Sequence, residues 1–314
     1  AEQRHEALET FYPELPWPTS WAQAADLTTL AAELEAYHDD TPSTDIVSLF
    51  GDLETGTWQI DQAVHELIIS GTPEAGLPDG HPAVETLAAH REAILTEEYL
   101  TYLDDLADHV EEAFETESVF SDQNHAHQFF SVESDSLESG EEVVIFVIDG
   151  LRFDLAHRLA EELRSSDRAT FTVEEQPWVG TLPSETKFGK AALTPGNKFD
   201  FSIGLDGDDI VPIRSGQVID NYWREKRLEN DGWTYITKSS GESDWNNSRV
   251  IYYSDDIDEL GHENLDDFEQ LFADRIETIA EMIEERLVET WETAYVVTDH
   301  GFVSLPSNTT LRSI

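Results

Sequence analysis

Acidic and histidine side chains follow three apolar, β-branched runs of this chain. Asp149 comes directly after the first run, Asp258 and His262 follow the second, and Asp299 and His300 follow the third. Carboxylates and neutral imidazoles are ligands that Zn²⁺ or Mn²⁺ accepts in proteins. Two such ions, about 3.5–4 Å apart, can hold the attacking and leaving oxygens of an in-line displacement. These residue types therefore predict a two-metal site for phosphate chemistry.

A candidate nucleophile lies between the first two runs, in the segment TLPSETKFGKAALTPG, where Pro183 breaks regular structure. Ser184 and Thr186 stand at the start of an expected helix, and either hydroxyl could act as the nucleophile. A hydroxyl that faces a metal at a helix N-terminus is held as an alkoxide, because cation and backbone N–H groups favour negative charge. The alternative is structural, with Ser184 as the N-cap and Thr186 in the first turn. Taken alone, the segment favours this structural alternative.

Two of the few lysines, Lys187 and Lys190, accompany the candidate nucleophile. A lysine at this position either binds phosphate or pairs with nearby carboxylates. Both interpretations stay open, and the second is favoured because acidic residues are so abundant.

Parallel β-strands are the elements that must position these side chains. Val143–Ile148 is continuously apolar and 294–297 is short and β-branched, as in strands that helices cover on both faces. Apolar residues at helical spacing in 152–164 complete half of a βαβ unit. Ligands of open α/β sheets bind outside the carboxyl ends of the strands. We therefore expect the acidic and histidine side chains to meet at that edge.

The chain is expected to divide into two domains. Residues 1–138 show helical spacing of apolar residues, as in 27–37 and 99–114, and carry no metal or phosphate motif. Residues 139–314 follow an acidic, Ser/Gly-containing linker and show βα alternation. The predicted fold class is therefore α/β, with a parallel-rich central sheet flanked by helices and a helical N-terminal domain before it.

The composition limits the classes of protein to which this chain can belong. The formal net charge is -49, yet 39% of the residues are hydrophobic and eight are tryptophans, so a folded core is expected. Acid spread along a folded chain is typical of a halophilic protein, because high salt screens the self-repulsion. The absence of cysteine excludes disulfides and Cys nucleophiles. No apolar run reaches about 18 residues and no signal pattern is seen, which predicts a cytoplasmic protein without a membrane partner.

The motifs VIDG, LPSET with a later TPG, DELGH and TDHGF occur in this order between about residues 141 and 303. This order resembles the alkaline phosphatase superfamily and, within it, the PglZ family known from BREX phage-defence systems. The resemblance implies an alkaline-phosphatase-like fold and a metal-dependent phosphatase or phosphodiesterase, or a nuclease. The implied partners are a phosphate ester, which includes a nucleotide or nucleic acid, and other defence-system proteins.

The same resemblance implies two divalent metal ions, zinc first, with manganese or magnesium as alternatives, and a nucleophile at Thr186 with Ser184 as the backup. The ligands that it implies for one ion are Asp149, Thr186, Asp299 and His300. Those that it implies for the other ion are Asp258 and His262. The family pattern has a further histidine for the second ion, and none follows His300 here. The α/β domain is therefore expected to be C-terminally incomplete, with reduced activity.

Two other functions stay open at this point. A non-catalytic assembly module of a defence complex, docking through its N-terminal helices, is consistent with the incomplete ligand set. A phosphomutase of the same superfamily favours Ser184 as the nucleophile, but the sequence shows no residues for the phosphosugar pocket that it needs.

Overall fold

The structure, a computed structural model, describes residues 17–39, 45–69, 82–114, 124–134, 137, 142–166, 171–195, 201–262, 268–289 and 291–301. The described residues form two compact units, one up to residue 114 and the other from residue 124. The division falls earlier in the chain than the expected boundary at residue 138. The short helices η2 (Ala126–Gln128) and α7 (Phe129–Val132) therefore belong to the second unit.

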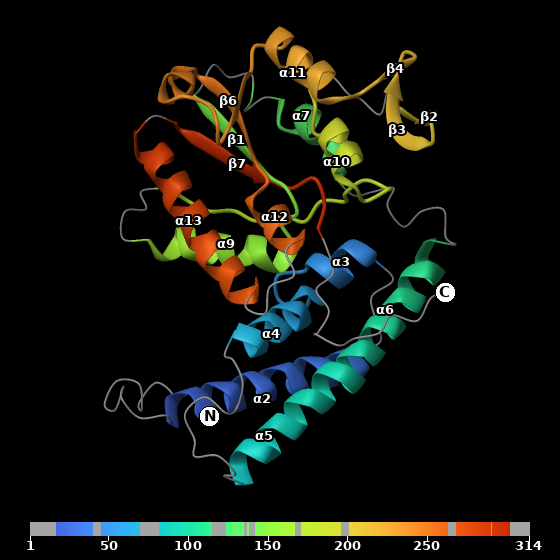
Figure 1. The fold of residues 1–314 in the computed structure, drawn as a ribbon, viewed down its shortest axis with the longest axis vertical. Coiled ribbons are helices and arrows are strands. Elements are labelled where there is room, and N and C mark those ends of the chain that lie inside the picture. Colours follow the sequence, from blue (N-terminus) through green and yellow to red (C-terminus); the bar gives the residue numbers. More distant parts are fainter. Residues whose placement is uncertain are drawn as a thin grey trace. The chain divides into compact units, whose positions relative to one another are not determined.

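The first unit is helical, as predicted. Its elements are α2 (Trp17–Asp39), α3 (Ile46–Gly51), α4 (Trp58–Ile69), α5 (Pro82–Ala93), the π-helical turn η1 (Ile94–Glu98) and α6 (Tyr99–Phe114). The last three follow one another without a break (Figure 1). Leu30 and Leu34 of α2, Leu67 of α4 and Tyr102 of α6 are fully buried in one apolar core. This burial stabilises the helices more than their intrinsic propensity does.

The second unit is built on a four-stranded sheet in the order β5-β6-β1-β7. The strands are β1 (Val143–Ile148), β5 (Thr234–Thr237), β6 (Arg249–Ser254) and β7 (Thr293–Val297). Every pairing is parallel, which confirms the parallel sheet that the sequence predicts. All four carboxyl ends therefore lie along one edge.

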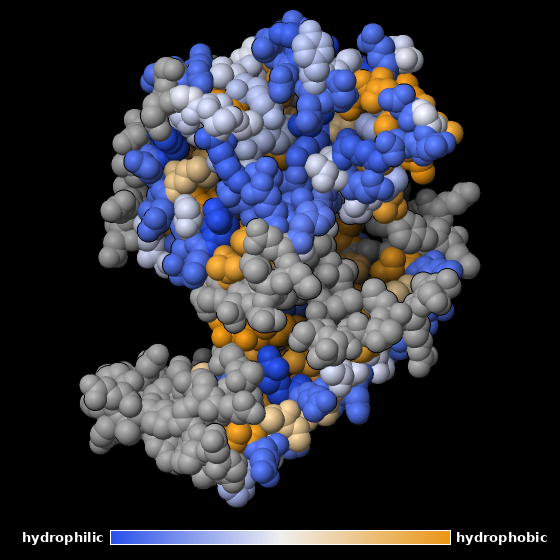
Figure 2. Space-filling model, in the orientation of Figure 1, coloured by the Kyte–Doolittle hydropathy of each residue, from blue (hydrophilic) through white to orange (hydrophobic). Residues whose placement is uncertain are grey.

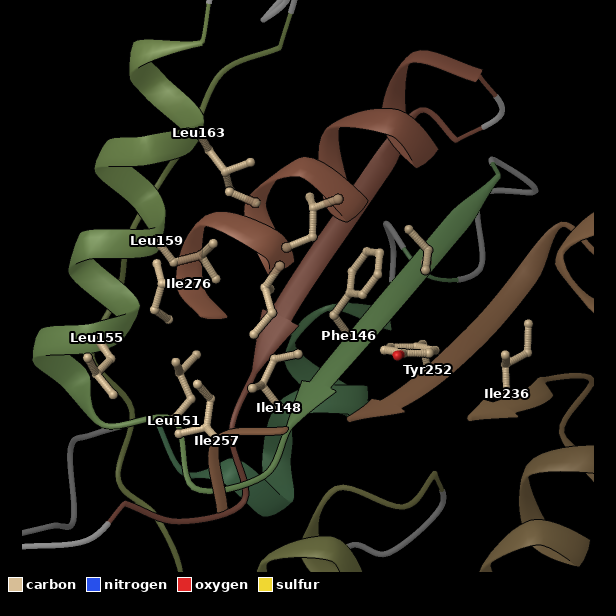
Figure 3. Close-up of a cluster of buried hydrophobic side chains, with 14 of the residues drawn as sticks. Phe146, Ile148, Leu151, Leu155, Leu159, Leu163, Ile236, Tyr252, Ile257 and Ile276 are labelled. Carbon is tan, nitrogen blue, oxygen red and sulfur yellow. The ribbon is translucent and has the colours of Figure 1, made fainter. Parts of the chain in front are cut away.

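Helices cover both faces of this sheet, and the alternating side chains of β1 enter two different cores. On one face, Phe146 and Ile148 pack with Leu155 and Leu159 of α9 (Phe153–Ser165) and with Ile276 of α13 (Phe268–Glu289), as Figure 3 shows. Because β1 is buried on both faces, it is apolar at every position.

The opposite face of the sheet packs against α7, α10 (Thr186–Ala192) and α11 (Asn221–Asn230) (Figure 1). Ile145 of β1 lies in a core with Phe129 of α7, Leu193 after α10 and Leu228 of α11. The helix α10, which carries the candidate nucleophile, is thus anchored to the sheet.

The described part of the segment between residues 197 and 248 contains a sheet edge and an insertion. The edge strand is β5, and the insertion is an antiparallel sheet of β2 (Ser202–Asp206), β3 (Asp209–Arg214) and β4 (Gln217–Val218). Exposed apolar side chains of β2 and β3 form an apolar patch on an otherwise largely hydrophilic face of this unit (Figure 2). A short turn, η3 (Glu242–Asn246), precedes β6. Among the described helices, none is both long and apolar enough to cross a bilayer.

Candidate metal centre

Buried acidic residues stand at the carboxyl ends of two neighbouring strands. Asp149 follows β1 and Asp299 follows β7, which pairs directly with β1. Only 3% of Asp149 and 2% of Asp299 is exposed. The Asp149 N–H donates to the Ser254 carbonyl of β6 at 2.8 Å, so the sheet ladder fixes the backbone of Asp149. The strand ends thus bring two carboxylates into one buried place.

His300 and Lys190 are the cationic partners of Asp149. Lys190 Nζ lies 2.5 Å from Asp149 Oδ2, and His300 Nε2 lies 3.1 Å from Oδ1. His300 Nδ1 lies 3.0 Å from the Gly301 carbonyl, to which its N–H donates. Thr186 Oγ1, at the first position of α10, lies 2.8 Å from His300 Nε2. Thr186 and Asp149 therefore contact the same imidazole nitrogen, His300 Nε2.

The charges of this cluster shift one another's pKa. Burial raises the pKa of Asp149, but the cationic partners His300 and Lys190 outweigh it and lower the pKa to about 2. The contact with Asp149 raises the pKa of His300 to about 9, against the opposing effect of burial. Burial and the nearby charge of Asp149 raise the pKa of Asp299 to about 6. Two carboxylates this close favour a cation between them.

A third carboxylate comes from α12 (Asp256–His262). One ligand atom each from Asp149, Asp258 and His300 all lie within 4.8 Å of one another. Among the described residues, Asp299 Oδ2 is buried and has no hydrogen-bond donor, while Asp149 Oδ1 has only the contact with His300 Nε2 at 3.1 Å. A buried carboxylate oxygen without a donor is costly, and a cation removes that cost. The oxygen and nitrogen donors therefore fit a divalent ion such as zinc or manganese. We call Asp149, Asp258, Asp299 and His300 the candidate metal centre.

Two glycines allow helices to approach this centre closely. Gly150 has φ +74°, a backbone conformation that glycine adopts readily, and a Cβ there would lie 3.3 Å from the Asp258 Cα. A Cβ on Gly189 would lie 2.7 Å from the Asp299 Cβ. The first glycine brings α12 to the end of β1, and the second brings α10 to the end of β7.

The other predicted residues lie outside this group. Ser184 is exposed, and the N-cap of α10 is Glu185. The structural alternative that made Ser184 the cap is therefore wrong, while Thr186 does lie in the first turn. His262 is 81% exposed in its side chain and lies 3.4 Å from Asp258 Oδ2. The structure thus places Asp258 with Asp149 and His300, which the resemblance put in a different ligand set.

Both lysines near the nucleophile pair with carboxylates, as one of the two interpretations predicted. Lys187 Nζ lies 3.1 Å from Glu185 Oε2 near the surface, whereas Lys190 reaches the buried Asp149. The scarcity of lysine in the chain was the signal that singled them out.

Sequence reasoning missed a cleft beside the metal centre. This cleft has a volume of about 420 Å³ and is lined by Lys190, Asn221, Arg224, Tyr235, Thr237, Lys238, Ser239, Tyr253, Ser254, Asp255 and Glu259. Most of these residues come from α11, β5 and β6, in segments without a recognisable motif. Only the fold brings them together.

A helix-covered parallel sheet with carboxylates and a histidine at its carboxyl edge is consistent with an alkaline-phosphatase-like domain. The family model described as the BREX system PglZ alkaline phosphatase-like domain matches residues 129–310. The chain therefore belongs to the PglZ family, which confirms the resemblance found in its motifs. No curated protein matches the chain.

Proposed function

We propose that this PglZ domain hydrolyses phosphate esters, with Thr186 as the nucleophile and with divalent ions held at the candidate metal centre. The observation that carries the proposal is the contact of Thr186 Oγ1 with His300 Nε2, beside the buried Asp149. Membership of the PglZ family supports a role in a BREX defence system, in which the domain would act with partner proteins.

Asp149, Asp258, Asp299 and His300 are the residues that would hold the ions, with zinc as the first choice and manganese or magnesium as alternatives. When bound, such ions lower the pKa of a nearby hydroxyl and offset the negative charge of a phosphoryl group. Lys190 pairs with Asp149 Oδ2, and Oδ1 faces His300 Nε2 at 3.1 Å, so Oδ1 and the imidazole would hold one cation together. The ligand set requires a deprotonated His300, so ion binding releases a proton from the imidazolium.

The chain's own residues place the nucleophile. Thr186 stands at the first position of α10, where free backbone N–H groups favour negative charge on its oxygen. In the proposed reaction, Thr186 Oγ forms a bond to phosphorus while the bond from phosphorus to the ester oxygen breaks. The hydroxyl proton of Thr186 passes to solvent, and the ester oxygen departs with its organic group as an alcohol, which takes up a proton from solvent. Water then attacks the phosphothreonine, which releases phosphate, or a phosphomonoester if the substrate is a diester, and restores the hydroxyl.

A trapping experiment tests this proposal. The protein is incubated with p-nitrophenyl phosphate and Zn²⁺ or Mn²⁺, quenched in acid within the first turnover and digested for mass spectrometry. We expect a phosphate group on Thr186 in the wild type and none in Thr186→Ala. The matched control is Ser184→Ala, which should leave the phosphothreonine unchanged. Phosphate on Ser184, or turnover by Thr186→Ala at the wild-type rate, contradicts the proposal.

A further inference from the structure

The cleft beside the metal centre is continuous with it through shared residues. Lys190 lines the cleft and also contacts Asp149. Ser254 lines it too, and its carbonyl accepts the hydrogen bond from the Asp149 N–H. Whatever binds in the cleft therefore lies next to a phosphoryl group bound at the metal centre.

Two of the three cations that line the cleft are already offset by carboxylates. Lys190 pairs with Asp149. Lys238 Nζ lies 2.7, 2.8 and 3.2 Å from carboxylate oxygens of Asp255, Asp256 and Glu259. These carboxylates supply more negative charge than the lysine carries. Neither lysine therefore leaves an unbalanced positive charge in the cleft.

Arg224, the third cation, is buried without such a partner. Only 4% of it is exposed, and within the part of the chain that the structure describes no carboxylate pairs with its guanidinium. Nη1 donates to Asn221 Oδ1 at 2.9 Å, and the guanidinium lies 4.9 Å from the centre of the Tyr253 ring. Among the residues that the structure describes, neither the buried Arg224 Nε nor the buried Tyr253 hydroxyl has a hydrogen-bond partner.

A buried guanidinium whose Nε–H has no acceptor is costly unless an anion meets it. This chain has 67 acidic residues against 18 basic ones, so a carboxylate partner was readily available. Its absence at a cleft wall indicates that the anion comes from a ligand. Guanidinium groups bind phosphate through two parallel hydrogen bonds, and the Tyr253 hydroxyl can donate a further one.

We propose that Arg224 and Tyr253 bind a second phosphate of the substrate, adjacent to the phosphate that is cleaved. The substrate class is therefore a phosphate ester that carries a second phosphate next to the one that is cleaved, and a nucleotide ester with two phosphates serves as the probe. This inference rests on the proposed hydrolase activity, and the experiment below separates a failure of one from a failure of the other.

The test compares two substrates that differ by one phosphate. These are the p-nitrophenyl ester of thymidine 5′-phosphate, with and without a 3′-phosphate, at one fixed KCl concentration. In the wild type, the 3′-phosphate should lower KM by about tenfold or more, the range of a charge-assisted hydrogen bond. In Arg224→Gln that advantage should disappear while kcat for the simpler ester persists, and Tyr253→Phe should lose part of it.

The matched control is Lys226→Gln on the same helix, because this exposed lysine pairs with Glu229 at the surface and does not line the cleft. It should keep the tenfold preference. Equal KM values for both esters in the wild type overturn the inference. An equal slowing of both esters in Arg224→Gln also overturns it, since Arg224 then acts on the cleaved phosphate. If Arg224→Gln loses its near-ultraviolet circular dichroism, Arg224→Lys replaces it, with a reduced preference expected.

A binding measurement covers the case in which the wild type hydrolyses neither ester, which would refute the hydrolase proposal alone. Calorimetry with inorganic pyrophosphate on chelator-treated protein then measures the cleft directly. Binding that weakens about tenfold in Arg224→Gln, but not in Lys226→Gln, supports the anion site. No binding, or equal binding by all variants, overturns it.

Discussion

Lys190, which is partly exposed, forms an ion pair with the buried Asp149 between α10 and the end of β1, with 2.5 Å between Nζ and Oδ2. The pair joins the helix that carries Thr186 to the strand that carries the central carboxylate. Without bound metal, Lys190 is one of two cations that keep Asp149 ionised inside the protein. The predictions that follow begin with this contact.

Lys190→Met should lower the free energy of unfolding of the metal-free protein by about 3 kcal/mol, because a buried carboxylate loses its nearest cation. Added Zn²⁺ should restore much of that loss. Urea unfolding at fixed KCl, with and without chelator, measures both effects. The matched control is Lys187→Met on the same helix, whose pair with Glu185 is near the surface. It should change stability by less than about 1 kcal/mol. Equal losses in both variants would contradict the assigned role of Lys190.

Asp258→Asn should reduce the amount of Zn²⁺ retained after gel filtration, because the ligand atom of Asp258 lies with those of Asp149 and His300. Loss of a direct metal ligand should weaken binding at least as much as loss of a supporting residue, which costs about 10–100-fold. His262→Gln is the comparison, since its side chain is 81% exposed and it is expected to retain more metal. Elemental analysis of both proteins measures the Zn²⁺ that each retains. A larger loss in His262→Gln would restore the ligand sets implied by the family resemblance.

Thr186→Ala should lower the hydrolysis rate of bis-p-nitrophenyl phosphate by about a thousandfold or more, as expected when the nucleophile itself is removed. Metal content and circular dichroism should stay close to those of the wild type. Thr186→Ser keeps a hydroxyl and should retain measurable activity. Ser184→Ala, in an exposed residue, should be near wild type. An active Thr186→Ala protein would refute the assignment of the nucleophile.

Asp256 should contribute stability that acid removes. Burial raises the pKa of its carboxyl, but Lys238, Ser254 and Arg275 outweigh burial and lower the pKa. A carboxyl whose pKa is lower in the folded state stabilises the protein above the unfolded value, about 3.9, and loses that effect as the pH falls through the folded value. Asp256→Asn should therefore destabilise the protein at pH 7 and have a smaller effect near pH 3. Urea midpoints across this range, at one KCl concentration, test the sign. An effect of Asp256→Asn that grows toward pH 3 contradicts it.

Stability should rise steeply with KCl concentration, because salt screens the self-repulsion of a chain with a net charge of -49. Melting temperatures from low to molar KCl, at constant pH and in the presence of chelator, measure this effect. A melting temperature that does not change with KCl would refute the halophilic interpretation.

Local sequence patterns predict the sheet better than they predict the site. The apolar run at Val143–Ile148 coincides with β1, because a strand buried on both faces needs apolar side chains at every position. The carboxyl-edge rule likewise places Asp149 and Asp299 together. The proximity of Asp258 to Asp149 depends on how α12 packs over Gly150, and no local pattern encodes that packing. Arg224 is similar, since its burial appears only when α11 docks on the sheet.

The three ligand groups that meet at the end of β1 come from segments far apart in the chain. An ion bound by Asp149, Asp258 and His300 would therefore act as a cross-link that closes two long loops. Cross-links of this kind restrict the unfolded chain most when the loops are long. Because this protein has no cysteine, the ion would provide the kind of cross-link that disulfides provide in other proteins. Removal of the ion by a chelator would then destabilise the fold as well as remove catalytic activity.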